Sequence, residues 1–128
     1  MIGRAGKNKG FTLIELLVVM SVIALLLTLA VPRYLGSIDK SKEAVLKENL
    51  ALMRDAIDKY YGDQGRYPDA LEDLMNKKYL RRIPPDPITE SATTWVVVPP
   101  EDAKKGAVYD VRSGATDPAR DGTTYRDW

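Results

Sequence analysis

The chain has 128 residues, a formal charge of +1, and neither cysteine nor histidine. It therefore cannot form disulfides, and it lacks both the commonest general base and the usual zinc ligands. No glycine-rich phosphate loop, Gly-x-Ser-x-Gly motif or large basic surface occurs, so nothing indicates an enzyme or a nucleic-acid partner. The length leaves room for one membrane segment and one small domain.

An apolar segment from Phe11 to Val31 dominates the first part of the sequence. A basic leader precedes it and ends at Gly10, and its charges are Arg4, Lys7 and Lys9. The polar residues inside the apolar segment are Thr12, Glu15, Ser21 and Thr28. As a helix, the segment is long enough to cross the roughly 30 Å apolar core of a bilayer.

Two ordinary interpretations of this segment are a signal peptide and a signal anchor. A cleaved signal peptide has a shorter apolar region, of about 7–15 residues, followed by a small-residue cleavage site. Residues 31–35, Val-Pro-Arg-Tyr-Leu, offer no such site. A signal anchor agrees with the length and the charges, but it leaves Glu15 unexplained, because an acid at the bilayer centre costs about 2.5–3.5 kcal/mol.

Residues 10–16, Gly-Phe-Thr-Leu-Ile-Glu-Leu, resemble the N-terminal motif of the type IV pilin and type II secretion pseudopilin superfamily. The glycine, the phenylalanine after it, the acid at Glu15 and the proline that ends the apolar segment, Pro32, all match. The resemblance implies that a prepilin peptidase cleaves between Gly10 and Phe11 and that Phe11 is then N-methylated.

The same resemblance divides the chain into three parts. They are a leader peptide over residues 1–10, a transmembrane and assembly helix over 11–32, and a periplasmic globular domain over 33–128. The basic leader would lie on the cytoplasmic side of the inner membrane, as the charge bias of membrane segments predicts. The protein would therefore span the membrane once, with its C-terminal domain in the periplasm.

Glu15 has a chemical role in this interpretation. Cleavage would give Phe11 a positive amine, which the Glu15 carboxylate of a neighbouring subunit can neutralise inside an apolar fibre. Because an uncompensated buried charge is costly, such a pair favours one axial stagger between subunits. Alternatively, Glu15 only accompanies its own helix N-terminus, where an anion is favourable by about 0.3–1 kcal/mol. Both can hold at different stages of assembly.

Helical periodicity continues beyond Pro32. An apolar stripe with spacings of three and four consists of Leu46, Leu50, Met53, Ile57 and Tyr60. Lys40, Lys42 and Lys47 are interpreted as a solvated surface rather than a binding patch, and Glu43 and Lys47 have the favourable order for an i,i+4 pair. We predict one helix from about Phe11 to Tyr61, kinked or locally loosened at Pro32 and Gly36.

Shorter elements follow the long helix. Residues 62–65, Gly-Asp-Gln-Gly, end it, and a second helix is predicted over 69–77, with a capping box formed by Asp69 and Glu72. The proline-rich residues 83–87 form an extended connector. Strands are predicted over 93–98 and 107–111.

These elements predict an α+β fold. A two-stranded hairpin is marginal alone, so it should pack on the C-terminal half of the long helix through Trp95, Val97 and Tyr109 or their neighbours. The fold class is then a long N-terminal helix with a membrane-spanning first half, a short second helix and a small antiparallel hairpin.

The tail from Ser113 to Trp128 is rich in glycine, aspartate and threonine. In position and in its final tryptophan it resembles the calcium-binding loop of type II secretion major pseudopilins. The resemblance implies a calcium ion held by Asp117 and, with a weaker match, Asp121, together with main-chain and water oxygens. Aspartate is equally at home in turns, and three nearby arginines depart from the resemblance: Arg112, Arg120 and Arg126.

The closest resemblance within the superfamily is to the major, G-type pseudopilin. It implies a structural subunit of a periplasmic fibre that supports export of folded proteins across the outer membrane. The implied partners are other copies of the chain, minor pseudopilins, the prepilin peptidase, an inner-membrane platform protein and an assembly ATPase. The alternatives are a type IV pilin or minor pilin of a surface filament and, in a different class, a membrane-anchored enzyme that uses only carboxylates.

Processing can be tested by intact-mass measurement of the mature protein. We expect the loss of residues 1–10 and the gain of one methyl group. A bulky substitution such as Gly10→Leu should block maturation, because the peptidase must fit the backbone at this position, whereas Gly10→Ala should be mild. A mature protein that still begins at Met1 would contradict the processing prediction.

Overall fold

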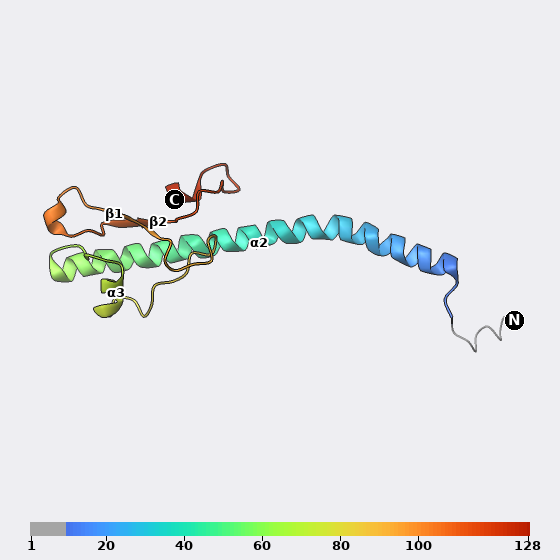
Figure 1. Ribbon diagram of the computed structural model, residues 1–128, viewed down its shortest axis with the longest axis horizontal. Helices are drawn as coiled ribbons and strands as arrows, with labels where there is room; N and C mark the ends of the chain where they lie inside the picture. Colours follow the sequence, from blue (N-terminus) through green and yellow to red (C-terminus); the bar gives the residue numbers. More distant parts are fainter. Residues whose placement is uncertain (1–9) are drawn as a thin grey trace. The chain divides into compact units, whose positions relative to one another are not determined.

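The computed structural model describes residues 10–128 (Figure 1). Its main elements are helix α2 (Leu13–Gln64), helix α3 (Glu72–Asn76) and strands β1 (Val96–Val98) and β2 (Asp110–Arg112). Short 3-10 turns occur at Ala103–Lys105 and Tyr125–Asp127. The chain forms two compact units, which divide between Ile38 and Asp39. The predicted leader, with Arg4, Lys7 and Lys9, lies outside the described residues except for Gly10.

The first unit contains the apolar half of α2. Thr12 caps this helix, because its hydroxyl accepts a hydrogen bond from the main-chain N–H of Glu15 at 3.0 Å. Within the helix, the hydroxyls of Ser21 and Thr28 each donate to the carbonyl four residues earlier at 2.8 Å. These side chains thus have partners without water, as a helix in lipid requires. By length and composition this helix can cross a membrane.

One long helix was predicted, and the structure confirms it. The helix continues through Pro32, although a proline inside a helix removes one main-chain hydrogen bond. The predicted loosening at Pro32 and Gly36 therefore does not interrupt the helix. The helix ends at Gln64, slightly later than predicted, and Gly65 follows with φ of 74°. Glycine adopts this left-handed conformation without strain, which explains the end of the helix there.

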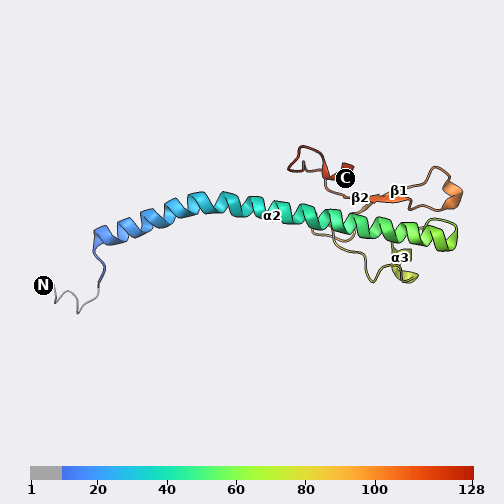
Figure 2. The same ribbon diagram turned by 180° about the vertical axis from the view of Figure 1, so that it is seen from behind.

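The predicted apolar stripe of α2 forms the core of the second unit. Leu46, Leu50, Met53, Ile57 and Tyr60 are all buried. They belong to one cluster with residues of α3, the hairpin and the tail, which include Leu74, Trp95, Val108, Val111 and Tyr125. Figures 1 and 2 show the hairpin along one side of this part of α2 and α3 on the other. Burial of each large side chain contributes about 1.5–3 kcal/mol.

The antiparallel hairpin is confirmed, but its strands are shorter than predicted. Val97 pairs with Val111 in the observed register. Trp95 is buried as predicted, whereas Val97 and Tyr109 are 38% and 52% exposed, so the packing uses their neighbours, the second option of the prediction. Val108 and Val111 are buried instead. The strand pairing does not reach Val108, because the main-chain N–H of Val108 donates to the carbonyl of Pro68 rather than to β1.

The second helix is also shorter than predicted, and its start differs. The predicted capping box at Asp69 and Glu72 is wrong, because the Asp73 carboxylate accepts from the main-chain N–H groups of Asp69 and Ala70, at 3.1 and 3.3 Å. The Asp69 carboxylate instead accepts from Arg66 at 2.7 Å. Residues 69–71 therefore form a turn that precedes α3.

A buried carboxylate connects the proline-rich segment to the start of the tail. Asp86 is fully buried. One of its oxygens accepts from the main-chain N–H of Ile88 at 2.8 Å, and the other accepts from the hydroxyl of Ser113. A Cβ atom at Gly114 would overlap the carbonyl of Thr94, so the chain needs glycine there. The connector and the tail are thereby fixed to each other.

Asp86→Ala should lower the free energy of unfolding by about 1–3 kcal/mol for each buried group left without its partner. The measurement is chemical unfolding of the full chain in detergent micelles, followed by circular dichroism. Asp58→Ala is the control, because Asp58 is exposed and exposed substitutions usually change stability by about 0.5 kcal/mol or less. Equal stability of the two variants would contradict the role given to Asp86.

Candidate functional site

The predicted cleavage site lies just before α2. Gly10 and Phe11 are not helical, and Phe11 is 77% exposed. A Cβ at Gly10 would meet no atom within 4 Å. The peptide bond between Gly10 and Phe11 is thus in a segment that an enzyme can approach. Cleavage and methylation themselves remain predictions.

Glu15 lies in the first turn of α2. Its main-chain N–H is the donor to the Thr12 cap, so it occupies the position at which capping boxes carry an acid. This supports the interpretation that Glu15 accompanies its own helix N-terminus. Its predicted pairing with a neighbouring Phe11 requires a second subunit and remains a prediction. The assembly role of Pro32, which is exposed inside α2, remains a prediction as well.

The apolar half of α2 is exposed on every side within the described chain. None of its most apolar stretch is buried, and Leu13, Ile14, Leu25 and Leu29 are each more than 60% exposed. An apolar surface that surrounds a helix is not stable in water. Lipid or other protein subunits must therefore cover it.

A second candidate site is the tail loop, by which we mean residues 113–128. Three charged side chains of α2 contact it: Glu43, Lys47 and Arg54. Their spacings of four and seven place them on one face of the helix. Of these, Lys47 was predicted to be solvated and is exposed, but the contacts of all three with the tail loop were not predicted.

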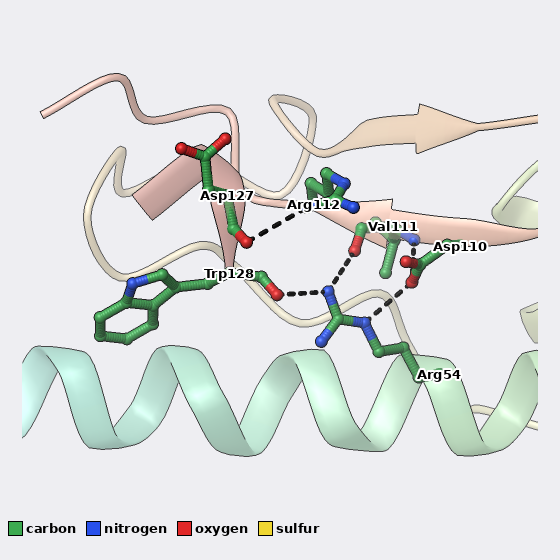
Figure 3. A network of polar contacts seen from close by, with 6 residues as sticks. All are labelled: Arg54, Asp110, Val111, Arg112, Asp127 and Trp128. Carbon is green, nitrogen blue, oxygen red and sulfur yellow. Dashed lines mark hydrogen bonds and ion pairs between the residues drawn. The ribbon is translucent and has the colours of Figure 1, made fainter. Parts of the chain in front are cut away.

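Arg54 joins the end of the tail loop to strand β2 (Figure 3). Its Nε donates to the Asp110 carboxylate at 2.8 Å. Its Nη2 donates to the carbonyl of Val111 at 3.0 Å and to the main-chain oxygen of Trp128 at 2.8 Å. Arginine is suited to this because its planar group presents several donors in fixed directions. Nearby, Arg112 donates to the carbonyl of Asp127 at 3.2 Å.

Glu43 holds the middle of the tail loop. Its Oε2 accepts from the hydroxyl of Tyr125 at 2.7 Å and from the main-chain N–H of Arg120 at 2.9 Å. Burial alone would raise the pKa of Glu43, but the hydrogen bonds from Tyr125 and Arg120 and the charge of Arg120 lower it overall. Burial, followed by the hydrogen bond to Glu43 and its charge, raises the pKa of Tyr125 to about 12. The favoured protonation states of this pair are thus an ionised Glu43 and a neutral Tyr125.

Trp128 completes the contact between the tail loop and α2. The ammonium of Lys47 lies 4.9 Å from the centre of its ring, within the range of a cation–π interaction. Its indole N–H donates to the hydroxyl of Thr123 at 2.7 Å. Its ring also packs edge-on against Tyr125, with centroids 5.1 Å apart. The aromatic end of the tail is therefore fixed at several points.

The predicted calcium ligands fit the observed contacts poorly. Asp121 Oδ1 accepts from both the main-chain N–H and the hydroxyl of Thr123, at 3.0 and 2.6 Å. These bonds lower the pKa of Asp121. Among residues 10–128, no three acidic, histidine or cysteine side chains are gathered closely enough to share a metal ion. Calcium needs six to eight oxygens, so Asp117 and Asp121 would supply few of them. Calcium binding stays a prediction.

Known proteins resemble the chain over most of its length. Residues 6–31 match the family described as "Prokaryotic N-terminal methylation motif". A "Type II secretion system core protein G" of Klebsiella michiganensis is 31% identical over 100 residues, 66% of this chain and 70% of that protein. The protein of the same name from Escherichia coli K12 is 32% identical over 127 residues, 87% of this chain and 83% of that protein. The chain belongs to the type II secretion system core protein G family.

A pilin is similar to this family member over a shorter stretch. The "Type IV major pilin protein PilA" of Myxococcus xanthus is 32% identical over 68 residues, 53% of this chain and 31% of that protein. No solved structure matches the chain. The predicted superfamily is confirmed, and the longer similarity to core protein G favours the secretion branch over the pilin branch.

Arg54→Ala should lower the free energy of unfolding by about 1–3 kcal/mol, because Asp110 and two main-chain oxygens lose their donor. The matched control is Arg66→Ala, whose ion pair with Asp69 has side chains that are 49% and 70% exposed. That pair should contribute about 1 kcal/mol or less. Chemical unfolding of both full-length variants in detergent micelles gives the comparison. A loss no larger for Arg54→Ala than for Arg66→Ala would refute this role.

Proposed function

We propose that the chain is a structural subunit of a pseudopilus-like fibre in a type II secretion system and supports export of folded proteins across the outer membrane. The observation that carries the proposal is the apolar half of α2, which lies within the matched methylation motif and is exposed on every side within the described chain. The similarity to core protein G over most of the chain supports the same role. We infer a structural role rather than an enzymatic one from this similarity to core protein G.

The exposed helix requires two successive environments. In the precursor, lipid of the inner membrane would cover it, since the helix satisfies its own main-chain groups apart from the bond lost at Pro32, and also the hydroxyls of Ser21 and Thr28. In the fibre, the same surface would be covered by the helices of other copies. The predicted domain over residues 33–128 would lie in the periplasm throughout.

Processing and assembly involve further partners. The prepilin peptidase would cleave the accessible bond after Gly10 and methylate Phe11. An inner-membrane platform protein and an assembly ATPase would then move subunits from the membrane into the fibre, where minor pseudopilins also take part. Glu15 would set the axial position of each new subunit by pairing with the Phe11 amine of its neighbour.

A type IV pilin or minor pilin is the second candidate, and the similarity to the Myxococcus pilin favours it. Deletion of the gene distinguishes the two functions. Loss of secreted proteins from the medium, with surface filaments unchanged, supports the secretion fibre. Loss of surface filaments with normal secretion would support the pilin instead.

Glu15→Ala should leave membrane insertion and cleavage near normal, because removal of a charge makes the segment more apolar. It should strongly reduce the yield of fibres, because the amine of the neighbouring Phe11 loses its partner. The measurement is electron microscopy of fibres sheared from cells that overexpress the protein. Glu48→Ala is the control, because this acid lies on the exposed surface of the same helix. Normal fibre yield from Glu15→Ala cells would refute the register role.

A further inference from the structure

The tail loop has little apolar surface of its own to hold it in place. Its buried residues, apart from Ser113, are two alanines, Ala115 and Ala119, and the ring of Tyr125. Two alanines contribute little to burial, because the stabilisation scales with the apolar area removed from water. The position of the loop on α2 must therefore depend on its polar contacts as well as on Tyr125.

The loop also closes on itself through its own main chain. The N–H of Ala119 donates to the carbonyl of Thr123, and the N–H of Gly122 donates to the carbonyl of Ala119. Pro118 and Thr124 form an isolated bridge. Gly122 has φ of 90°, which glycine tolerates. The carboxylate of Asp121, which lies in this turn, accepts a hydrogen bond from the main-chain N–H of Thr123. The turn is thus closed by groups that the chain itself provides.

The loop presents donors to α2 where it meets Glu43. These donors are the N–H of Arg120 and the O–H of Tyr125, and a single oxygen of Glu43 accepts both. A cation requires the opposite arrangement, in which carbonyl and carboxylate oxygens converge. An ionised carboxylate only accepts hydrogen bonds. The loop therefore contacts Glu43 through donors, as it would contact a bound anion, and the Glu43 side chain takes the place of that anion.

The surroundings of Glu43 contain charges of both signs. Arg120 lies near its carboxylate and favours the ionised form, whereas Asp121 opposes it. The charges of Asp39 and Asp117 lie near enough to Tyr125 to help raise its pKa. The two hydrogen bonds to Glu43 therefore hold the loop on the helix although acids lie nearby.

We propose that Glu43 holds the tail loop on α2 in the place of a bound cation, so that the loop keeps this position in a calcium-free solution. In this arrangement Glu43 fixes the middle of the loop, while Lys47 and Arg54 fix its end at Trp128. The proposal concerns the folded chain and not the fibre, so its failure would leave the proposed function untouched.

The test is hydrogen exchange at the Arg120 amide, whose N–H is the donor to Glu43. The full chain is measured in detergent micelles, once with millimolar calcium and once with a chelator. For the unaltered protein we expect slow exchange at the same rate in both solutions. In Glu43→Ala the exchange rate should rise roughly tenfold or more in both solutions, because the Arg120 amide loses its acceptor and the loop opens more often. Glu48→Ala is the matched control and should exchange like the unaltered protein.

Tyr125→Phe keeps the aromatic ring in the core and removes only the hydroxyl. It should speed exchange at Arg120 by less than Glu43→Ala does, and equally with and without calcium. This variant decides the question if Glu43→Ala fails to fold, which circular dichroism would show. Faster exchange of the unaltered protein in chelator, matched by Asp117→Ala in calcium, would overturn the proposal and establish a calcium site. Exchange in Glu43→Ala no faster than in Glu48→Ala would overturn it as well.

Discussion

The elements of the second unit depend on one apolar stripe of α2, which runs from Leu46 through Met53 to Tyr60. A helix of five residues and two strands of three residues are too short to be stable alone. They are ordered because each places side chains on this stripe, such as Leu74 of α3 and Val111 of β2. The first half of α2 has the opposite character, since its apolar side chains have no protein partner within the described chain. One helix thus carries both the core of a domain and a surface that requires lipid or further subunits.

Helix α2, its buried stripe and the α+β class could be predicted from the sequence, because burial on a helix leaves a periodic pattern. The lengths of the strands and of α3 could not. They depend on main-chain contacts between distant residues, such as that of Val108 with Pro68, and on the choice of Asp73 rather than Asp69 as the acceptor. Such contacts leave no local pattern in the residues that make them.

The candidate functional sites also differ in whether the sequence alone reveals them. Gly10, Phe11 and Glu15 could be found from the sequence because they form a local motif of a known family. The contacts of Glu43, Lys47 and Arg54 with the tail were not predicted, because charges at these spacings occur equally on exposed helices. The one distinguishing signal of these three residues is that they lie beside the buried stripe, four and seven residues apart, facing a tail with few apolar residues.

The contacts of the tail loop also have a mechanical consequence for α2. They extend from Glu43 to Arg54, a stretch of about 16 Å at a rise of about 1.5 Å per residue. Bending of the helix in this stretch would change the distance between these two side chains and strain the loop that connects them. The tail loop therefore stiffens this part of α2. A subunit that transmits force along its helix would benefit from a second chain segment attached at both ends of the loaded stretch.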